Sequence, residues 1–198
     1  MKRIVAATKN QNKVREIRAI TDEFGFEIVS RDEAGVPDVE IVEDGETFYD
    51  NSYKKAYEIM KLSGEITIAD DSGLCVDALD GAPGVMSARF SETGDDKENN
   101  RKVLELMKDV PMEKRTARFV SVITMVYPDG KVISAEGKVE GHIMFEESGE
   151  NGFGYDPMFR PLGYDKTFGE LPAELKNSIS HRGNALRALR EKLKANDC

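Results

Sequence analysis

The first thirty residues constrain the fold most, because they place a helical stretch between two short strand-like runs. Residues 4–7 read IVAA, which is typical of a short buried strand, and residues 26–30 read FEIVS, which alternates as a strand does. Between these runs, the apolar residues at positions 14, 17, 20 and 24 share one helix face, and Gly25 ends the helix. Strand, helix and strand in this order favour a right-handed parallel unit.

The rest of the chain adds further helices and a hairpin. Three more stretches have helical periodicity: residues 47–62, residues 96–110 and the tail from Pro172. Residues 66–69 form a strand that leads directly into two aspartates. The strand-like residues 115–127 and 131–139 flank Pro128-Asp129-Gly130, whose residue types favour a tight turn and so predict a hairpin. This order predicts one α/β domain over residues 1–198, with a mixed sheet.

The composition excludes several classes of protein. The chain has 28 basic and 37 acidic residues, a net charge of −9, and a uniformly acidic surface would repel nucleic acids and anionic membranes. No apolar run fits a signal peptide or approaches the roughly 20 residues of a membrane-spanning helix. Cys75 and Cys198 cannot build a disulfide framework, so we expect two free thiols in a reducing compartment.

The charge is distributed unevenly along the chain. Residues 38–50 contain six acids and no Lys or Arg, whereas residues 173–194 contain six bases and two acids. Such polarity suits a site that holds both a cation and an anion, although two solvated faces would give the same pattern.

The loop of residues 8–13, TKNQNK, lies between the first strand and the first helix. Backbone N–H groups at a helix N-terminus favour phosphate, and Lys13 adds a cation in the first turn. The loop is not a P-loop, because it lacks the glycines and the GK[ST] ending. Alternatively, Asn12 is a plain N-cap and Lys13 is solvated.

Asp70 and Asp71 are adjacent carboxylates where a strand is predicted to end. On a strand they would point to opposite faces, so one could bind a ligand while the other makes structural hydrogen bonds. Mg²⁺ is the natural partner, because one or two carboxylates and substrate phosphates suffice to hold it. Glu43 could supply a second carboxylate, with Lys54 and Lys55 on the next helix. The alternatives are a turn capped by the two aspartates and a solvated acidic loop.

Two later segments carry aromatic rings and N–H donors. Residues 152–157, GFGYDP, let the backbone approach a flat ligand on which a ring can stack, unless Phe153 or Tyr155 belongs to the core. Lys176, His181 and Arg182 offer donors for a carbonyl or phosphate oxygen, unless Ser180 merely caps a helix and the arginine lies on the surface.

Together, these segments resemble the inosine/xanthosine triphosphate pyrophosphatase family. The similarity runs from about residue 3 to residue 190. It is carried by six motifs in the family's order: TxNxxK at 8–13, E-x-G-x-T-F at 43–48, ADDSGL at 69–74, GAPGVMSARF at 81–90, GFGYDP at 152–157 and SHRGNAL at 180–186.

The resemblance implies a fold, a reaction and a setting. The fold is an elongated mixed β-sheet flanked by helices, in two lobes with an active-site cleft between them. The reaction is Mg²⁺-dependent hydrolysis of a purine nucleoside triphosphate to the monophosphate and pyrophosphate, with ITP, dITP and XTP as substrates. The setting is a cytoplasmic homodimer that binds neither nucleic acid nor membrane.

The resemblance also implies residue roles. Asp71 is the expected general base and, with Glu43, a metal ligand. The expected substrate-binding residues are Thr8, Lys9, Asn10, Gln11, Asn12, Lys13, Lys55, Ser72, Phe153, Gly154, Tyr155, Asp156, Lys176, His181 and Arg182. Many relatives have Glu-Asn-Ala where this chain has Asp50-Asn51-Ser52, so a role for Asp50 is left open, as is metal contact by Asp50 or Asp70.

Hydrogen-bond chemistry then predicts the selectivity. Hypoxanthine and xanthine accept at position 6, where adenine donates, so a donor from Arg182 or His181 would reject adenine. An aspartate with a pKa near 4 is a weak base, so Asp71 would chiefly position water and metal. Two alternatives stay open: a pyrophosphatase of similar fold with another base specificity, and a non-hydrolysing nucleotide sensor. The intact acids and lysines argue against the sensor.

Overall fold

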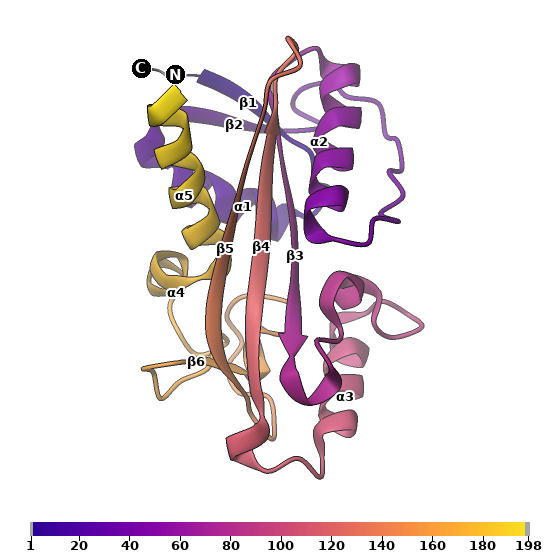
Figure 1. Cartoon of the computed structure of the whole chain (residues 1–198), viewed down its shortest axis with the longest axis vertical. Helices are drawn as coiled ribbons and strands as arrows, with labels where there is room; N and C mark the ends of the chain where they lie inside the picture. The colour runs from indigo at the N-terminus through magenta and orange to yellow at the C-terminus, as the bar shows by residue number, and fades with distance from the viewer. Residues whose placement is uncertain (1, 197–198) are drawn as a thin grey trace. The chain divides into compact units, whose positions relative to one another are not determined.

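A six-stranded mixed sheet organises the chain, in the order β2-β1-β3-β4-β5-β6 (Figure 1). The computed structural model describes residues 2–196, so the prediction for Cys198 lies outside the described residues. The strands are β1 (Lys2–Ala6), β2 (Phe26–Ser30), β3 (Thr67–Val76), β4 (Thr116–Val126), β5 (Val132–Ile143) and β6 (Phe159–Pro161). β1 pairs in parallel with β2 and β3, whereas β5 and β6 are antiparallel. The predicted mixed α/β architecture is therefore confirmed.

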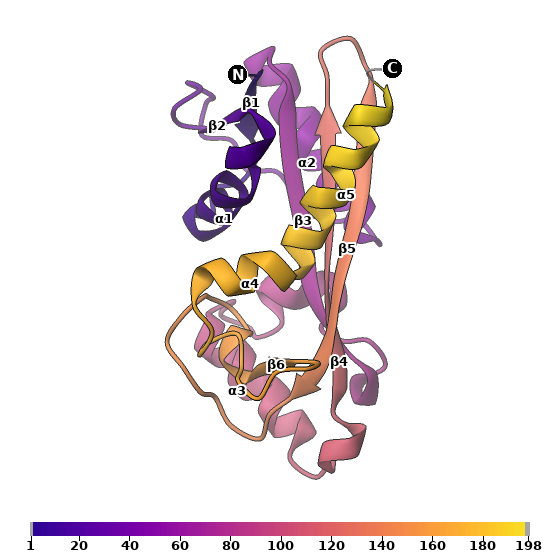
Figure 2. The same ribbon diagram turned by 90° about the vertical axis from the view of Figure 1, so that its left-hand side faces the viewer.

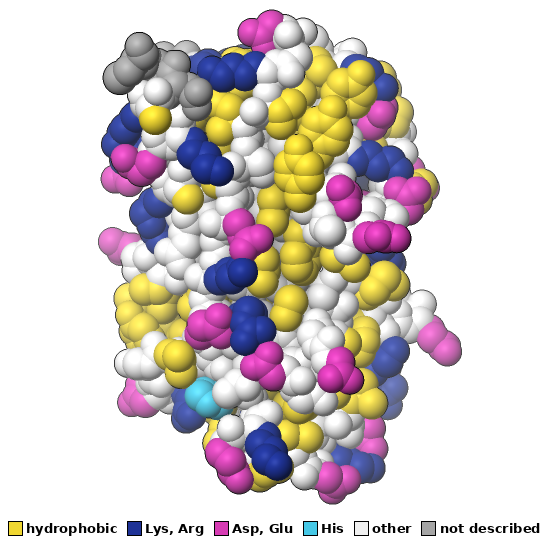
Figure 3. Space-filling model, in the orientation of Figure 1, with side chains coloured by type: hydrophobic (Ala, Val, Ile, Leu, Met, Phe, Trp, Pro, Cys, Tyr) yellow, Lys and Arg dark blue, Asp and Glu magenta, His cyan; other side chains and the backbone are white. Residues whose placement is uncertain are grey.

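Five α-helices accompany these strands in the described part of the chain. They are α1 (Gln11–Thr21), α2 (Phe48–Ser63), α3 (Asp96–Met107), α4 (Ala173–Ile179) and α5 (His181–Asn196). Within residues 2–196, no helix combines the length and the apolar character needed to cross a membrane. On the face shown in Figure 3, basic and acidic side chains are interspersed, so the net negative charge does not form a single patch there.

The chain divides into two compact units, each with its own core. Unit 1 comprises the chain up to Asp71, residues 121–137 and the chain from Arg182, and unit 2 comprises residues 72–120 and 138–181. The strands β3, β4 and β5 each contribute residues to both units.

Unit 1 has helices on both faces of its strands. Ile17 of α1 and Leu186 of α5 pack in one cluster with Ile68 of β3, whereas Ile59 of α2 packs in another with Ala69. In Figure 1, α5 (yellow) lies to the left of the strands and α2 to the right, and Figure 2 shows α5 across the front of them. Successive residues of β3 thus face different helices, as the pleat of a strand requires.

Unit 2 is built around α3 and a group of aromatic rings. Val103 and Met107 of α3 are fully buried in a cluster that includes Phe119 and Phe159. The rings of Phe119 and Phe159 lie 4.6 Å apart, and Phe168 stands 5.3 Å from Phe159. This aromatic core supports the loop of residues 149–156.

The structure confirms some predicted boundaries and corrects others. The hairpin turn is confirmed, with Gly130 at φ +88° donating to the carbonyl of Tyr127. The predicted strand end at residue 69 is wrong, because β3 continues to Val76. The helical tail is interrupted at Ser180, whose extended backbone (ψ 159°) separates α4 from α5. The sequence analysis missed β6, a strand of only three residues.

Candidate active site

Asp70 lies inside β3 and is held by cations on one face of unit 1. Its Oδ2 is 2.7 Å from Lys13 Nζ and 3.1 Å from Arg182 Nη2, and its Oδ1 accepts from Ser121 Oγ over 2.6 Å. Burial by itself would raise the pKa of Asp70, but the charges of Arg182 and Lys13 outweigh it and hold that pKa well below the usual range. Asp70 is therefore a fixed anion that positions two cations.

Asp71 is the next residue of β3 and faces α2. Its Oδ1 lies 3.1 Å from Lys55 Nζ, and its Oδ2 accepts a long hydrogen bond of 3.4 Å from Asn51 Nδ2. Burial raises the pKa of this carboxyl, and the nearby Lys55 and Lys13 reverse only part of that shift. The two aspartates therefore differ in chemistry, as adjacent residues on opposite faces can. Ser72, the next residue, is half-buried and belongs to unit 2.

Glu43 and Asp71 share one ammonium group. Lys55 Nζ is 2.8 Å from Glu43 Oε1, and it also donates to the backbone carbonyl of Asp70 over 2.9 Å. Although burial alone would lower the pKa of Lys55, the charges of Asp71 and Glu43 raise it. Two carboxylates thus converge on one positive charge.

Asn51 is a site residue that the sequence analysis missed. It is fully buried, and its Oδ1 accepts from the backbone N–H of Gly45 over 2.8 Å while its amide reaches Asp71. A Cβ on residue 45 would lie 2.7 Å from Asn51 Oδ1, so this approach requires glycine. The sequence analysis considered Asp50, where this chain differs from the Glu-Asn-Ala of many relatives, but not the neighbouring Asn51.

Asp50 closes the N-terminus of α2. Its Oδ2 accepts from the backbone N–H and the hydroxyl of Thr47, and Thr47 Oγ1 accepts from the Asp50 N–H in return. This capping box gives the shortened acid a structural role.

In the predicted phosphate loop, the N-cap is Asn10. Its Oδ1 accepts from the N–H groups of Asn12 and Lys13, so the alternative that Asn12 caps the helix is wrong. Thr8 Oγ1 accepts from the Asn10 N–H, and Lys9 pairs with the exposed Asp38. Gln11 begins α1 and is exposed. The side chain of Asn10 thus binds two of the backbone N–H groups that were expected to bind phosphate.

Arg182 adds a buried guanidinium to the acidic cluster of unit 1. Only 1% of its side chain is exposed, and it pairs with Asp70 and with Glu16, which the sequence analysis also missed. The cluster then consists of three cations and four carboxylates, with a net formal charge of −1: Lys13, Lys55, Arg182, Glu16, Glu43, Asp70 and Asp71.

A second group of predicted residues comes together in unit 2. Lys176 Nζ is 2.6 Å from Asp156 Oδ2, with both side chains 4% exposed, and it stands 4.9 Å from the ring centre of Phe153. The same Asp156 oxygen accepts from the Phe153 N–H over 2.9 Å. A Cβ on residue 152 would lie 2.1 Å from this oxygen, so the turn requires Gly152.

Two neighbours of this group are buried. Tyr155 belongs to the core of unit 2, as one alternative allowed, and its hydroxyl donates to the carbonyl of Ser87 over 2.6 Å. His181 begins α5 and stacks on Phe119, with ring centres 4.7 Å apart and planes at 15°. Phe153 is only half-buried, so it is the ring of this loop with an open surface.

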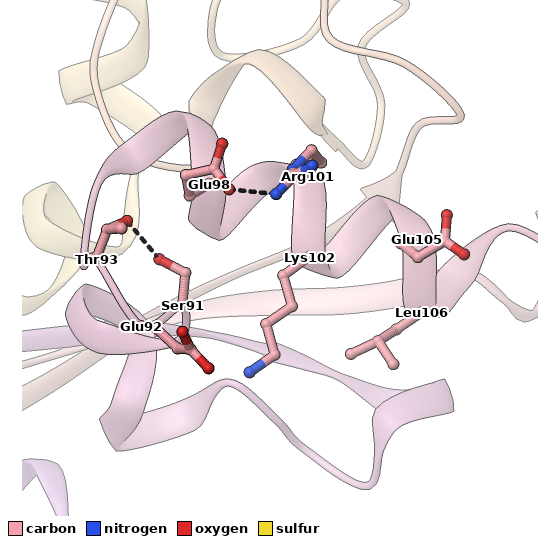
Figure 4. A pocket seen from close by; sticks show the side chains of 8 residues that line it. All are labelled: Ser91, Glu92, Thr93, Glu98, Arg101, Lys102, Glu105 and Leu106. Atoms are coloured by element: carbon pink, nitrogen blue, oxygen red, sulfur yellow. Dashed lines mark hydrogen bonds and ion pairs between the residues drawn. The ribbon is translucent and has the colours of Figure 1, made fainter.

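A separate pocket of about 570 Å³ lies beside α3 in unit 2 (Figure 4). Its lining residues are Ser91, Glu92, Thr93, Glu98, Arg101, Lys102, Glu105 and Leu106. None of them is a predicted site residue, and they comprise three acids and two bases, of which Glu98 and Arg101 form an ion pair. The polar clusters, rather than this hollow, are the candidate active site.

Comparison with known proteins identifies the family of the chain. A model of the Ham1 family matches residues 4–192. The dITP/XTP pyrophosphatase of Desulforamulus reducens is 51% identical over 191 residues, covering 96% of this chain and 94% of that protein. The Clostridium perfringens dITP/XTP pyrophosphatase is 49% identical, with 98% of each chain covered. The solved structure of the Staphylococcus aureus Ham1 protein superposes with a TM-score of 0.85 at 39% identity, over 98% of this chain and 100% of the other. The chain therefore belongs to the Ham1 family.

Proposed function

We propose that this protein hydrolyses deaminated purine nucleoside triphosphates (ITP, dITP and XTP) to the monophosphate and pyrophosphate, and so removes them from the nucleotide pool. The observation that carries the proposal is the pair of acids on β3: Asp70 is bound by Lys13 and Arg182, whereas Asp71 and Glu43 lie around Lys55 Nζ. The relatives named dITP/XTP pyrophosphatase support the same substrates.

We propose Mg²⁺ as the cofactor. Glu43 and Asp71 fit it, because they already converge on one positive charge and supply hard oxygen ligands. Mg²⁺ can be held by one or two carboxylates together with phosphates and water, so these two side chains would suffice. When bound, the ion would neutralise phosphate charge and lower the pKa of a bound water.

The local charge explains why a cation is needed. A triphosphate carries about four negative charges, and a cluster with a net charge of −1 would repel it. Lys13 and Lys55 are neutralised by their carboxylate partners, so they attract phosphate only if those carboxylates are otherwise compensated. A divalent cation at Glu43 and Asp71 would compensate the partners of Lys55, and Arg182 shares Asp70 with Lys13.

The residues of unit 1 would then have separate roles in the hydrolysis. Asp71 would accept a proton from the attacking water, since it is a buried carboxylate whose two oxygens are held by neighbouring donors. Asn51 and Lys55 fix the direction of its two oxygens. Lys13 binds phosphate oxygen, and Asp70 holds Lys13 in place. The α-phosphorus receives the water, and pyrophosphate leaves.

Phe153, Lys176 and His181 of unit 2, together with Arg182 of unit 1, are proposed to bind the base. Phe153 would stack on the purine, with Lys176 beside its ring. His181 and Arg182 would offer donors to the oxygen at position 6, where adenine carries an amino group. The remaining residues of the predicted set are proposed contacts of the same kind: Thr8, Lys9, Asn10, Gln11 and Asn12 for phosphate, and Ser72, Gly154, Tyr155 and Asp156 for the nucleoside.

We further propose a single domain, from the order of the elements, and a homodimer and a cytoplasmic location, from the family resemblance. Sedimentation equilibrium of the purified chain checks the dimer: a mass near twice 22.1 kDa supports it, and a monomer contradicts it.

Pyrophosphate release with ITP, XTP, GTP, ATP and dUTP tests the function. We expect rapid turnover of ITP and XTP, slow turnover of GTP and ATP, and loss of activity when EDTA removes Mg²⁺. Preferred turnover of dUTP would indicate another base specificity, and tight ITP binding without release would indicate a sensor.

A further inference from the structure

The loop that carries Phe153 is held by helix α3. The N–H of Gly154 donates to Asp96 Oδ2 over 3.0 Å, and the carbonyl of Gly154 accepts from Asn100 Nδ2 over 3.0 Å. Asp96 and Asn100 are four residues apart, so they occupy the same face of the helix. One helix face therefore binds both polar groups of a single loop residue.

These bonds fix the backbone next to Phe153. Gly154 takes a φ of +60°, a left-handed conformation that the two side chains of α3 hold from outside the loop. On the other side, Asp156 accepts from the Phe153 N–H. The ring of Phe153 is only half-buried and lies beside Lys176, so this backbone helps to set its position.

Helix capping does not account for these two side chains. The N-cap of α3 is Asp95, whose Oδ1 accepts from the N–H groups of Lys97 and Glu98 over 2.9 and 3.3 Å. Asp96 directs its carboxylate to the loop instead. Asn100 is 97% buried, and both of its described hydrogen bonds use Nδ2, one to Gly154 and one to Glu147.

We propose that Asp96 and Asn100 are positioning residues for base binding: they set the place of Phe153 and thereby the preference for deaminated purines. The inference rests on the proposed function, in which Phe153 stacks on the base. Neither residue touches the base in this proposal, and both act through Gly154.

Matched variants separate positioning from stability. Asp96→Ala removes the acceptor for Gly154, and Asn100→Asp sets a carboxylate against the Gly154 carbonyl. For both we expect the KM for ITP to rise about tenfold with little change in kcat, as loss of one hydrogen bond to Gly154 implies, and the ITP/ATP ratio of kcat/KM to fall. Asp95→Ala removes only the cap, so it should lower Tm and leave that ratio unchanged. Asp96→Asn keeps an acceptor oxygen and should retain the parental ratio.

Hydrogen–deuterium exchange of residues 149–156 gives a readout that needs no activity. Asp96→Ala should speed exchange there, whereas Asp95→Ala should not. Faster exchange with an unchanged ITP/ATP ratio, or an equal fall of that ratio in Asp95→Ala, would overturn the inference. If the unaltered chain hydrolyses no purine triphosphate, the proposed function is overturned first. If it hydrolyses ITP and Asp96→Ala behaves as the parent in both assays, only the positioning role fails.

Discussion

Asn51 and Asp71 are twenty residues apart in the chain, yet Asn51 Nδ2 lies 3.4 Å from Asp71 Oδ2 and both side chains are buried. Lys55 binds the other oxygen of the same carboxylate, one turn further along α2. A single helix therefore orients both oxygens of the proposed base, and the predictions below start from this arrangement.

Replacing Asp71 should separate binding from turnover. Asp71→Asn keeps the shape of the side chain but removes its ability to accept a proton, so we expect kcat for ITP to fall about 100-fold or more, with nucleotide affinity largely kept. Pyrophosphate release and calorimetric binding of ITP measure the two quantities. Asp44→Asn, an exposed aspartate paired with Lys54, is the control and should match the parent. Equal losses of binding and turnover in Asp71→Asn would contradict the role of a base.

Replacing Asn51 should disturb Asp71 without touching its charge. Asn51→Leu leaves the Gly45 N–H and one Asp71 oxygen without this partner, at a cost of about 1–3 kcal/mol in stability. We expect kcat to fall about tenfold as the carboxylate loses its fixed direction. Thermal unfolding and steady-state kinetics check the two effects. An unchanged kcat with a lowered Tm would reduce Asn51 to a purely structural residue.

Replacing Lys55 should reveal the electrostatic repulsion between the carboxylates of Glu43 and Asp71. Lys55→Met leaves two carboxylates without their shared cation, and breaking a buried ion pair in this way costs about 3–5 kcal/mol. MgCl₂ should restore part of the lost stability, because a divalent cation can replace the missing charge. Chemical denaturation with and without MgCl₂ measures this.

Lys54→Met is the neighbouring control for that experiment. Lys54 pairs with exposed Asp44, so its loss should change stability little and give no specific response to Mg²⁺. If Lys55→Met and Lys54→Met respond alike to MgCl₂, the proposed metal ligands are wrong.

Replacing Arg182 tests how position 6 of the purine is read. Arg182→Ala should narrow the difference in kcat/KM between ITP and ATP, because a donor that rejects adenine is lost. It also deprives Asp70 and Glu16 of a partner, so stability should fall, although Asp70 keeps Lys13 and Ser121. Arg190→Ala, on the same helix, is the control. If the ITP/ATP difference survives in a folded Arg182→Ala protein, another group reads position 6.

Local sequence patterns predicted the elements of this fold better than their ends. The helical periodicity of residues 47–62 and the turn residues at 128–130 are local signals, so α2 and the hairpin were placed within a few residues. The extension of β3 past residue 69 was not predictable in this way. Two aspartates favour a turn unless distant cations compensate them, and Lys13 and Arg182 do so only in the folded chain.

The candidate site shows the same limit. The sequence suggested Glu43 as a second carboxylate beside Asp71, with Lys55 on the next helix, but their placement around one ammonium is a property of the fold. Asn51 and Glu16 were missed because an isolated amide or acid carries no signal in a sequence. The raised pKa of Asp71 corrects the expectation of an ordinary carboxyl near pKa 4, since burial in β3 decides it.

Because Asp70 and Asp71 lie on opposite faces of β3, the chemistry of the candidate site depends on how β3 pairs with its neighbours. A slip of β3 by one residue against β1, whose Val5 now pairs with Thr67, would turn every side chain to the opposite face and exchange the two acids. Asp70 would then lie where Asp71, the proposed proton acceptor, lies now. Turnover by this enzyme therefore depends on the correct register of β3. A chain whose sheet is out of register should lose catalysis before it loses its secondary structure.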